Sequence, residues 1–354
     1  MAQEINLGPI LQYPNEVPVI VWEQDDEALG TVLVMDEYLN EYYFTDNLVS
    51  ERHEVEIQLE GFDSYDRYEY FILNENGEPI FGSSFFIPAI AECREFNFLL
   101  VGDTRRNGNR HNQVVSSWLP YIDSAAFYLN TGDIVTYGNQ MDDWEDFLEV
   151  EDDTISQLYF FPTIGNHDHD ERDNTLIPEI FVLPGNELFY SWRWGNIFFI
   201  SLDGEINNEH TTLTQDQIDW LGLELASASS DSTIDHIIVA VHRGPFGATG
   251  SHYGSIRIRS LMDLFEQNRV NLIVSGHDHL YQHGVSNNGI DYLISAGGGA
   301  GRYSPSENTS SSHTVIYTES VHHFVYANVQ GPVINFTAIN TDGEIIDEFQ
   351  LPHR

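Results

Sequence analysis

Five apolar segments of this sequence end in residues of the kinds that bind metal ions. In chain order these end residues are Asp103, Asp133, Asn166-His167-Asp168, His242, and His277 with His279. In open α/β sheets, ligands bind beyond the carboxyl ends of the strands, so a fold could gather residues that the chain order scatters. A single Gly-Asp pair is usually a turn, and a single histidine is often a core residue. All five together favour one shared site.

The residue types indicate which ions such a site would hold. Imidazole, carboxylate and amide oxygen suit Zn, Fe or Mn, and the only thiol of the chain, Cys93, belongs to none of the motifs. Two metal ions about 3.5–4 Å apart can hold both oxygens of an in-line displacement at phosphorus. Such a pair needs a carboxylate that bridges the two ions. We therefore expect a dinuclear centre that hydrolyses phosphoesters.

The elements that must position these residues begin near residue 95. Strand-like runs alternate there with helix-length segments, which predicts an α/β layered domain. One helix should begin at Thr214 as its N-cap, and residues 322–351 alternate like antiparallel strands. Before this part, short strands rich in Val, Ile, Tyr and Phe predict a small β-sandwich. Those short strands are expected at 17–22, 30–35, 53–59 and 68–73. We place the two domains at residues 1–92 and 93–354.

The order GD, GD, GNHD, H and GHxH resembles that of the calcineurin-like metallophosphoesterase superfamily. The stretches "GPILQYPNEVPVIVWE" and "HRGPFGATGSHYGS" are similar to the purple acid phosphatases and their bacterial relatives. This resemblance implies a fibronectin-III-like β-sandwich followed by a four-layer α-β-β-α sandwich. In that fold two stacked sheets are flanked by helices and carry two metal ions.

The resemblance also implies the roles of individual residues. Two ligand sets share a bridging carboxylate: Asp103, Asp133 and His279 for one ion, and Asp133, Asn166, His242 and His277 for the other. His167 takes the position of a histidine that contacts phosphate or protonates the leaving group. Asp168 would orient that imidazole, as carboxylates behind an active site often do.

The first motif departs from the family pattern. Many members have Asp-x-His here, with the histidine as a ligand, whereas this chain has Arg105 at that position. Purple acid phosphatases instead use a tyrosine three residues after the bridging aspartate. That position is Thr136 here, and Tyr137 follows it. The fourth ligand of the first ion is therefore open, and the candidates are Tyr137, His111, Asn107 and water.

The charge of the chain limits its partners. Its 14 basic residues are all arginine, and 56 acidic residues give a formal charge of −42. Such a polyanion repels nucleic acid and anionic membranes, so we expect neither as a partner. A phosphate substrate then needs a local cation. Arg105 and Arg243 each lie within two residues of an expected ligand, and surface ion pairs are the alternative for them. His252, in a glycine-rich stretch, is either part of the pocket wall or of an ordinary loop.

We predict a phosphomonoesterase in which a metal-bound hydroxide attacks phosphorus in line. A phosphodiesterase or promiscuous phosphoesterase is the alternative within this class. A degenerate, metal-binding interaction protein is the alternative of another class. The partner is a small phosphoester, and the oligomeric state stays open. The start of the chain has no apolar signal core. We expect a mature secreted or periplasmic chain, with a cytoplasmic protein as the alternative.

Overall fold

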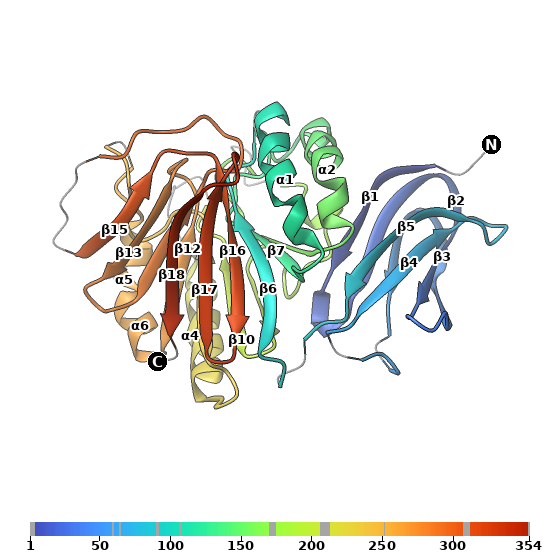
Figure 1. The fold of residues 1–354 in the computed structure, drawn as a ribbon, viewed down its shortest axis with the longest axis horizontal. Coiled ribbons are helices and arrows are strands. Elements are labelled where there is room, and N and C mark those ends of the chain that lie inside the picture. Colours follow the sequence, from blue (N-terminus) through green and yellow to red (C-terminus); the bar gives the residue numbers. More distant parts are fainter. Residues whose placement is uncertain are drawn as a thin grey trace.

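Two β-sheets lie face to face in the larger part of the molecule (Figure 1). This computed structural model describes residues 4–58, 60–63, 65–89, 92–105, 108–169, 175–205, 213–250, 252–306 and 312–352. Within them, one sheet has the strand order β18-β17-β16-β6-β7-β8, and its β6, β7 and β8 are parallel. Its strands are β6 (Glu95–Val101), β7 (Phe127–Asn130), β8 (Tyr159–Pro162), β16 (His323–Gln330), β17 (Val333–Asn340) and β18 (Ile345–Pro352).

The second sheet has the order β15-β13-β14-β12-β11-β10-β9. Its strands are β9 (Tyr190–Trp194), β10 (Ile197–Leu202), β11 (His236–Val241), β12 (Val270–Ser275), β13 (Tyr281–Ser286), β14 (Asp291–Ser295) and β15 (His313–Glu319). The strands β10, β11, β12 and β14 are parallel. On β11, Ile238 and Ala240 join the core between the sheets, while Ile237 and Val239 pack under the helices. This alternation is the period of two that a strand buried on both faces requires.

Helices cover the outer faces of both sheets, so the expected α/β layering is confirmed (Figure 1). The helices are α1 (Gly108–Ile122), α2 (Met141–Ile155), α3 (Ile177–Ile180), α4 (Gln215–Ser230), α5 (Ile256–Ser260) and α6 (Met262–Gln267). Trp118 of α1 packs on Tyr128 and Phe324 of the six-stranded sheet. The apolar faces of α4 and α6 bury against the seven-stranded sheet. Thr214 caps α4, as the sequence predicts, by accepting from the amide of Gln217.

The N-terminal strands form a third sheet. Its strands are β1 (Ile5–Gln12), β2 (Val19–Met35), β3 (Glu41–Glu56), β4 (Arg67–Leu73) and β5 (Pro79–Phe86). The separate strands expected at 17–22 and 30–35 are wrong, because β2 runs through both as one strand. The strand continues through the intervening acidic residues, with an irregular register between Glu23 and Ala28. The short helix η1 (Pro14–Glu16) joins β1 to β2.

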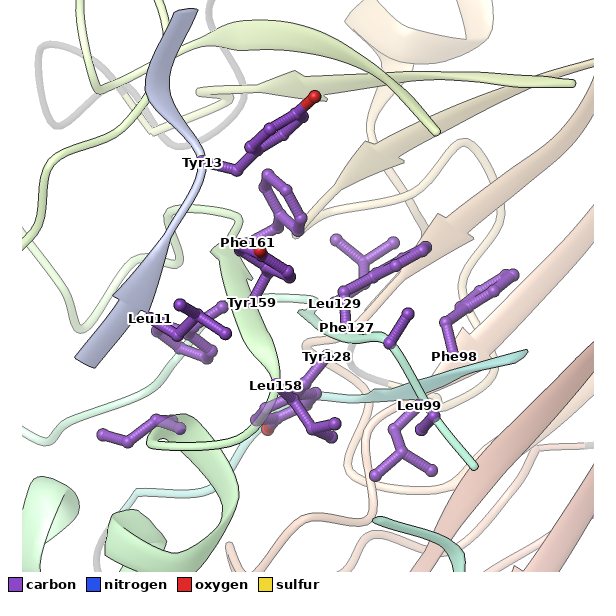
Figure 2. Close-up of a cluster of buried hydrophobic side chains, with 14 of the residues drawn as sticks. Leu11, Tyr13, Phe98, Leu99, Phe127, Tyr128, Leu129, Leu158, Tyr159 and Phe161 are labelled. Carbon is purple, nitrogen blue, oxygen red and sulfur yellow. The ribbon is translucent and has the colours of Figure 1, made fainter. Parts of the chain in front are cut away.

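The N-terminal sheet shares a core with the layered part. Tyr13, just after β1, packs edge-on against Tyr159 of β8 and Trp194 of β9, each at a centroid distance of 5.6 Å. Figure 2 shows Tyr13 and Tyr159 in this cluster. The amide of Gln12 also donates to the carbonyl of Phe160 at 3.0 Å. No helix among the described residues has both the length and the apolar character that are needed to cross a membrane.

Candidate metal centre

The expected metal-binding residues follow five strands at their carboxyl ends. The strands β6, β7, β8, β11 and β12 end at Val101, Asn130, Pro162, Val241 and Ser275. Because these strands run parallel to one another within each of the two stacked sheets, their ends meet at one edge of the sandwich. Asp103, Asp133 and His279 come together there, with one ligand atom of each within 4.8 Å of the others, and all three are buried. A cluster of this composition can hold a transition-metal ion.

Several of these residues have a backbone that side chains seldom adopt. Asp103, Asp133, His277 and His279 have φ angles of 58°, 55°, 70° and 45°. A positive φ costs a residue other than glycine of the order of 1 kcal/mol or more, and such strain collects at functional sites. The turns are held by hydrogen bonds between them. The amide of Asp103 donates to the carbonyl of Gly132, and the amide of His277 donates to Oδ2 of Asp103.

The glycines of the motifs permit the loops to approach each other. A Cβ on Gly276 would lie 2.6 Å from Oδ2 of Asp103 and 3.0 Å from Nδ1 of His242. A Cβ on Gly132 would lie 2.9 Å from the same imidazole nitrogen, and its φ is 92°. These contacts are too short for any side chain. At the Gly-Asp and Gly-His pairs, backbone segments and a metal-ligating side chain therefore pack so closely that only glycine fits.

The second expected ligand set lies against the first. Nε2 of His242 is 3.2 Å from Oδ1 of Asp133, while its Nδ1 contacts the carbonyl of Thr131 at 2.9 Å. His242 and His277 lie edge to face with a centroid distance of 5.2 Å. Asn166 Oδ1 is buried without a hydrogen-bond partner, whereas Asp103 Oδ1 and His242 Nε2 each lie in an imidazole–carboxylate contact of 3.1 or 3.2 Å. All three atoms are of types that coordinate metals, so the residues fit the expected ions.

The acidic and imidazole groups of the site shift each other's pKa. Although burial alone would raise it, the neighbouring His242, His167 and Arg105 hold the pKa of Asp133 well below its usual range. Burial alone would lower the pKa of His242, but the carboxylate of Asp133 raises it to about 10. Burial and the neighbouring His242 and Arg243 lower the pKa of His277. Several groups with strongly shifted pKa values, gathered at the carboxyl ends of neighbouring strands, are typical of a functional site.

Arg105 lies inside the first ligand set. Its Nε donates to Oδ2 of Asp133 at 2.9 Å, and its Nη2 is 3.4 Å from Nε2 of His279. Only 7% of the residue is exposed. Nε2 of His279 is also 3.1 Å from Oδ1 of Asp103. The guanidinium thus contacts a carboxylate and an imidazole that the sequence assigns to the first ion.

Tyr137 and His111 were candidates for the fourth ligand of the first ion. Both side chains lie away from the ligand set, so neither is a ligand in this structure. Tyr137 is 53% exposed, because it follows the buried turn that holds Asp133 and lies in a surface loop. Both ring nitrogens of His111 are engaged away from the site. Its Nδ1 contacts the carbonyl of Gly298 at 2.7 Å, and its Nε2 lies 3.0 Å from Glu151 of α2. The third candidate, Asn107, and the neighbouring Arg106 lie outside the described residues.

His167 borders the site, but Asp168 does not orient it. Nδ1 of His167 contacts the carbonyl of Thr136 at 3.0 Å, and the amide of His167 donates to Oδ1 of Asp133. The carboxylate of Asp168 instead accepts from four backbone amides, those of Asp133, Ile134, Val135 and Gly165. Asp168 therefore fixes the turn that carries Asp133. The expectation that Asp168 orients His167 is therefore wrong.

A pocket of about 350 Å³ opens beside the second ligand set. Arg243, His252 and His277 line it together with apolar groups from Phe246 and Ile256. Nη1 of Arg243 is 3.0 Å from Nε2 of His277. The ring of His252 stacks on His277 at a centroid distance of 4.2 Å, as expected for a pocket wall.

Three residues that the sequence reasoning missed support this pocket. Glu205 binds Arg243, Asp278 binds Nδ1 of His252 at 2.8 Å, and Tyr303 stacks on His279 at 4.3 Å. A signal existed for Glu205, because "DGE" follows the apolar end of β10 just as the metal motifs follow their strands. Tyr303 lies in a loop whose sequence has no such pattern.

Comparison with known proteins agrees with this geometry. Residues 96–281, just over half of the chain, match the calcineurin-like phosphoesterase family. An uncharacterized protein of Mycobacterium tuberculosis is 28% identical over 181 residues, which are 44% of this chain and 34% of that protein. The chain thus spans about a third of that relative's length. Purple acid phosphatase 4 of Arabidopsis thaliana is 24% identical over 231 residues, 57% of this chain and 68% of that protein.

The fold of the whole chain has a similar counterpart among solved structures. The yellow lupin purple acid phosphatase PPD1 superposes with a TM-score of 0.80 at 14% identity, covering 99% of this chain and 74% of that one. This likeness extends over the N-terminal sheet as well as the layered part. The matched segment contains the ends of the five strands and every residue of the two ligand sets. The chain belongs to the calcineurin-like phosphoesterase family.

Proposed function

We propose that this protein hydrolyses phosphoric esters, with a preference for monoesters, at a centre of two metal ions. The observation that carries the proposal is the buried cluster of Asp103, Asp133 and His279, with one ligand atom of each within 4.8 Å of the others. Two carboxylates and an imidazole this close together, at the carboxyl ends of parallel strands, form a ligand set for a metal ion. Iron, zinc and manganese all suit these donors.

The chain would hold the ions with the two ligand sets that the sequence predicts. The first set is Asp103, Asp133 and His279, and the second is Asp133, Asn166, His242 and His277. When bound, such ions polarise phosphoryl oxygens and lower the pKa of water enough for attack near neutral pH. Asp168 and the strained turns keep Asp133 at the shared position.

His167 is placed to handle the leaving group. Its Nδ1 donates to the carbonyl of Thr136, which fixes the tautomer and leaves Nε2 as the free nitrogen. Burial lowers the pKa of the ring, so it is neutral in the resting protein. A phosphate dianion beside it would draw a proton onto Nε2. From there the proton can pass to the oxygen that leaves phosphorus.

The pocket beside His277 supports the preference for monoesters. In a chain with a charge of −42, Arg243 supplies a cation where the phosphoryl group would sit. Its planar fork can hold two phosphate oxygens. Phe246, Tyr253 and Ile256 line the remaining wall. A pocket of about 350 Å³ has room for one organic substituent of a phosphoester.

We also propose that residues 1–92 form a fibronectin-III-like domain and residues 93–354 the catalytic domain. Five antiparallel strands at the N-terminus support this division. The aromatic contacts of Tyr13 then make the interface between the two domains.

The test is hydrolysis by the full chain after reconstitution with Mn²⁺, Zn²⁺ or Fe. We expect faster turnover of p-nitrophenyl phosphate than of bis-p-nitrophenyl phosphate. The variants D133N and H242A should lose both metal and activity, because each removes a donor of the predicted centre. Faster diester turnover would favour the phosphodiesterase alternative. Bound metal without hydrolysis of either ester would favour a metal-binding interaction protein.

A further inference from the structure

We propose that Arg105 is the resident cation of the first metal position, which therefore binds its ion more weakly than the second position does. The inference rests on the proposed ligand sets. It concerns the residue that lies two positions after Asp103, the first predicted ligand. The arginine supplies to Asp133 and His279 a positive charge that would otherwise come from the ion.

The contacts of Arg105 are those of a bound cation. Its Nε donates to Oδ2 of Asp133 at 2.9 Å, and its Nη2 lies 3.4 Å from Nε2 of His279. The side chain is 7% exposed and Asp133 is 1% exposed, so solvent does not screen the pair. A guanidinium keeps its charge at any physiological pH. A buried, charge-assisted hydrogen bond of this kind is strong and is costly to break.

The two arginines of the site differ in their carboxylate partner. Arg243 also contacts a predicted ligand, His277, but its charge is balanced by Glu205, which belongs to neither ligand set. The carboxylate partner of Arg105 is Asp133, the predicted bridge itself. An ion that enters the second position leaves the Arg243–Glu205 pair intact. Binding at the first position must displace Arg105 from Asp133 or place a dication beside a guanidinium.

The first position also has fewer donors. His111 and Tyr137 are directed elsewhere, which leaves Asp103, Asp133 and His279 as its protein ligands among the described residues. Oδ2 of Asp133 is occupied by Arg105, whereas Oδ1 faces His242 of the second position. We therefore expect a dissociation constant roughly tenfold to a hundredfold higher at the first position, the range over which neighbours of ligands change metal affinity.

The experiment is a metal titration of the chelator-treated full chain with Mn²⁺, followed by calorimetry and checked by elemental analysis after dialysis. Wild type is compared with R105Q, which removes the charge, and with R105H, which offers a donor. R110Q is the matched control, since Arg110 is an exposed arginine of α1. We expect one tight and one weak ion in wild type and R110Q. In R105Q and R105H the two affinities should converge.

A second readout does not depend on metal. In excess chelator, R105Q should melt at a lower temperature than wild type, because Asp133 loses its partner, while R110Q should melt like wild type. Equal affinities for two ions in wild type would overturn the inference, even if no variant folds. So would an unchanged affinity gap in R105Q. Unequal binding in a protein that hydrolyses no phosphoester would instead overturn the proposed function and leave this inference standing.

Discussion

Nε of Arg243 lies 2.8 Å from Oε1 and 3.1 Å from Oε2 of Glu205. Glu205 is 4% exposed, and burial raises the pKa of its carboxyl. The pair fixes the direction in which the guanidinium can meet an anion in the pocket. Glu205 comes from the end of β10 and Arg243 from the end of β11, so two adjacent parallel strands build the side of the pocket where we propose that phosphate binds.

The variant E205Q should weaken substrate binding. A neutral amide keeps the shape of Glu205 but cannot balance the charge of Arg243, so the arginine loses its fixed direction. We expect KM for p-nitrophenyl phosphate to rise by about tenfold, with a smaller change in kcat, because phosphate is held in both the ground and the transition state. Steady-state kinetics measure this. The control is E145Q, because Glu145 of α2 is exposed. An unchanged KM in E205Q would show that Glu205 does not position Arg243 for substrate.

Replacing Asp168 with asparagine should loosen the turn that carries Asp133. The carboxylate accepts from four amides, and an asparagine would direct its NH₂ group at some of these donors. We expect a loss of about 3 kcal/mol of unfolding free energy, since a buried donor left without an acceptor costs about 1–3 kcal/mol. Metal affinity should fall by about 10–100-fold as well. Denaturant unfolding and metal titration report the two effects, with exposed D153N as control. Normal stability in D168N would refute the structural role.

The variant H167Q should retain its metal and lose turnover. His167 lies at the edge of the site, and no metal donor is assigned to its side chain. Removing a proton donor of this kind lowers kcat by about 10²–10⁴-fold. Elemental analysis and kinetics on the same sample separate the two properties. A variant that loses its metal together with its activity would show that His167 is a ligand.

Stability should fall as the pH is lowered through the range in which histidine normally protonates. His323 of β16 is fully buried, and burial lowers its pKa from 6.5 to about 4. Between these values the unfolded chain binds a proton that the folded chain does not. The contribution of His323 is therefore complete above about pH 6.5 and is lost as the pH falls towards 4, a change of about 3 kcal/mol. Unfolding of wild type and H323Q at several pH values measures the difference, which should shrink in acid. A constant difference would contradict this assignment.

Salt should stabilise the protein. Its formal charge of −42 makes the folded chain repel itself, and added ions screen that repulsion. We expect the melting temperature to rise between about 50 mM and 1 M KCl, where the Debye length falls from over 10 Å to about 3 Å. Thermal unfolding at a fixed metal concentration tests this. A falling or constant melting temperature would show that attraction within ion pairs contributes more to stability than repulsion from the net charge.

The clustering of the predicted ligands could be foreseen because each of them follows the end of a strand. An apolar run followed by glycine and a ligand fixes both the strand and the position of the side chain. Parallel strands of stacked sheets then bring Asp103, Asp133 and His279 together without any information on loops. The N-terminal strands were predicted less well. Nothing in the acidic run from Glu23 to Glu27 shows that β2 passes through it.

The partners of the functional residues could not be predicted, because they depend on contacts between distant segments. Asp168 looked like a companion of the adjacent His167, yet its carboxylate accepts hydrogen bonds from three amides that lie 33 to 35 residues earlier in the chain. His111 looked available for metal, but α2 presents Glu151 to it. Sequence spacing gives the position of a side chain along its own element and says little about which element faces it.

The contacts of Tyr13 also have a thermodynamic consequence. Its ring packs against Tyr159 and Trp194, which themselves lie 5.2 Å apart, and all three belong to one buried cluster that extends from the N-terminal sheet to the sheet carrying the ligands. Cutting the chain after residue 92 would leave this aromatic surface exposed to water on both fragments. The N-terminal sheet and the catalytic layers should accordingly melt in one cooperative transition, so that a substitution in the N-terminal sheet lowers the temperature at which the metal site is lost.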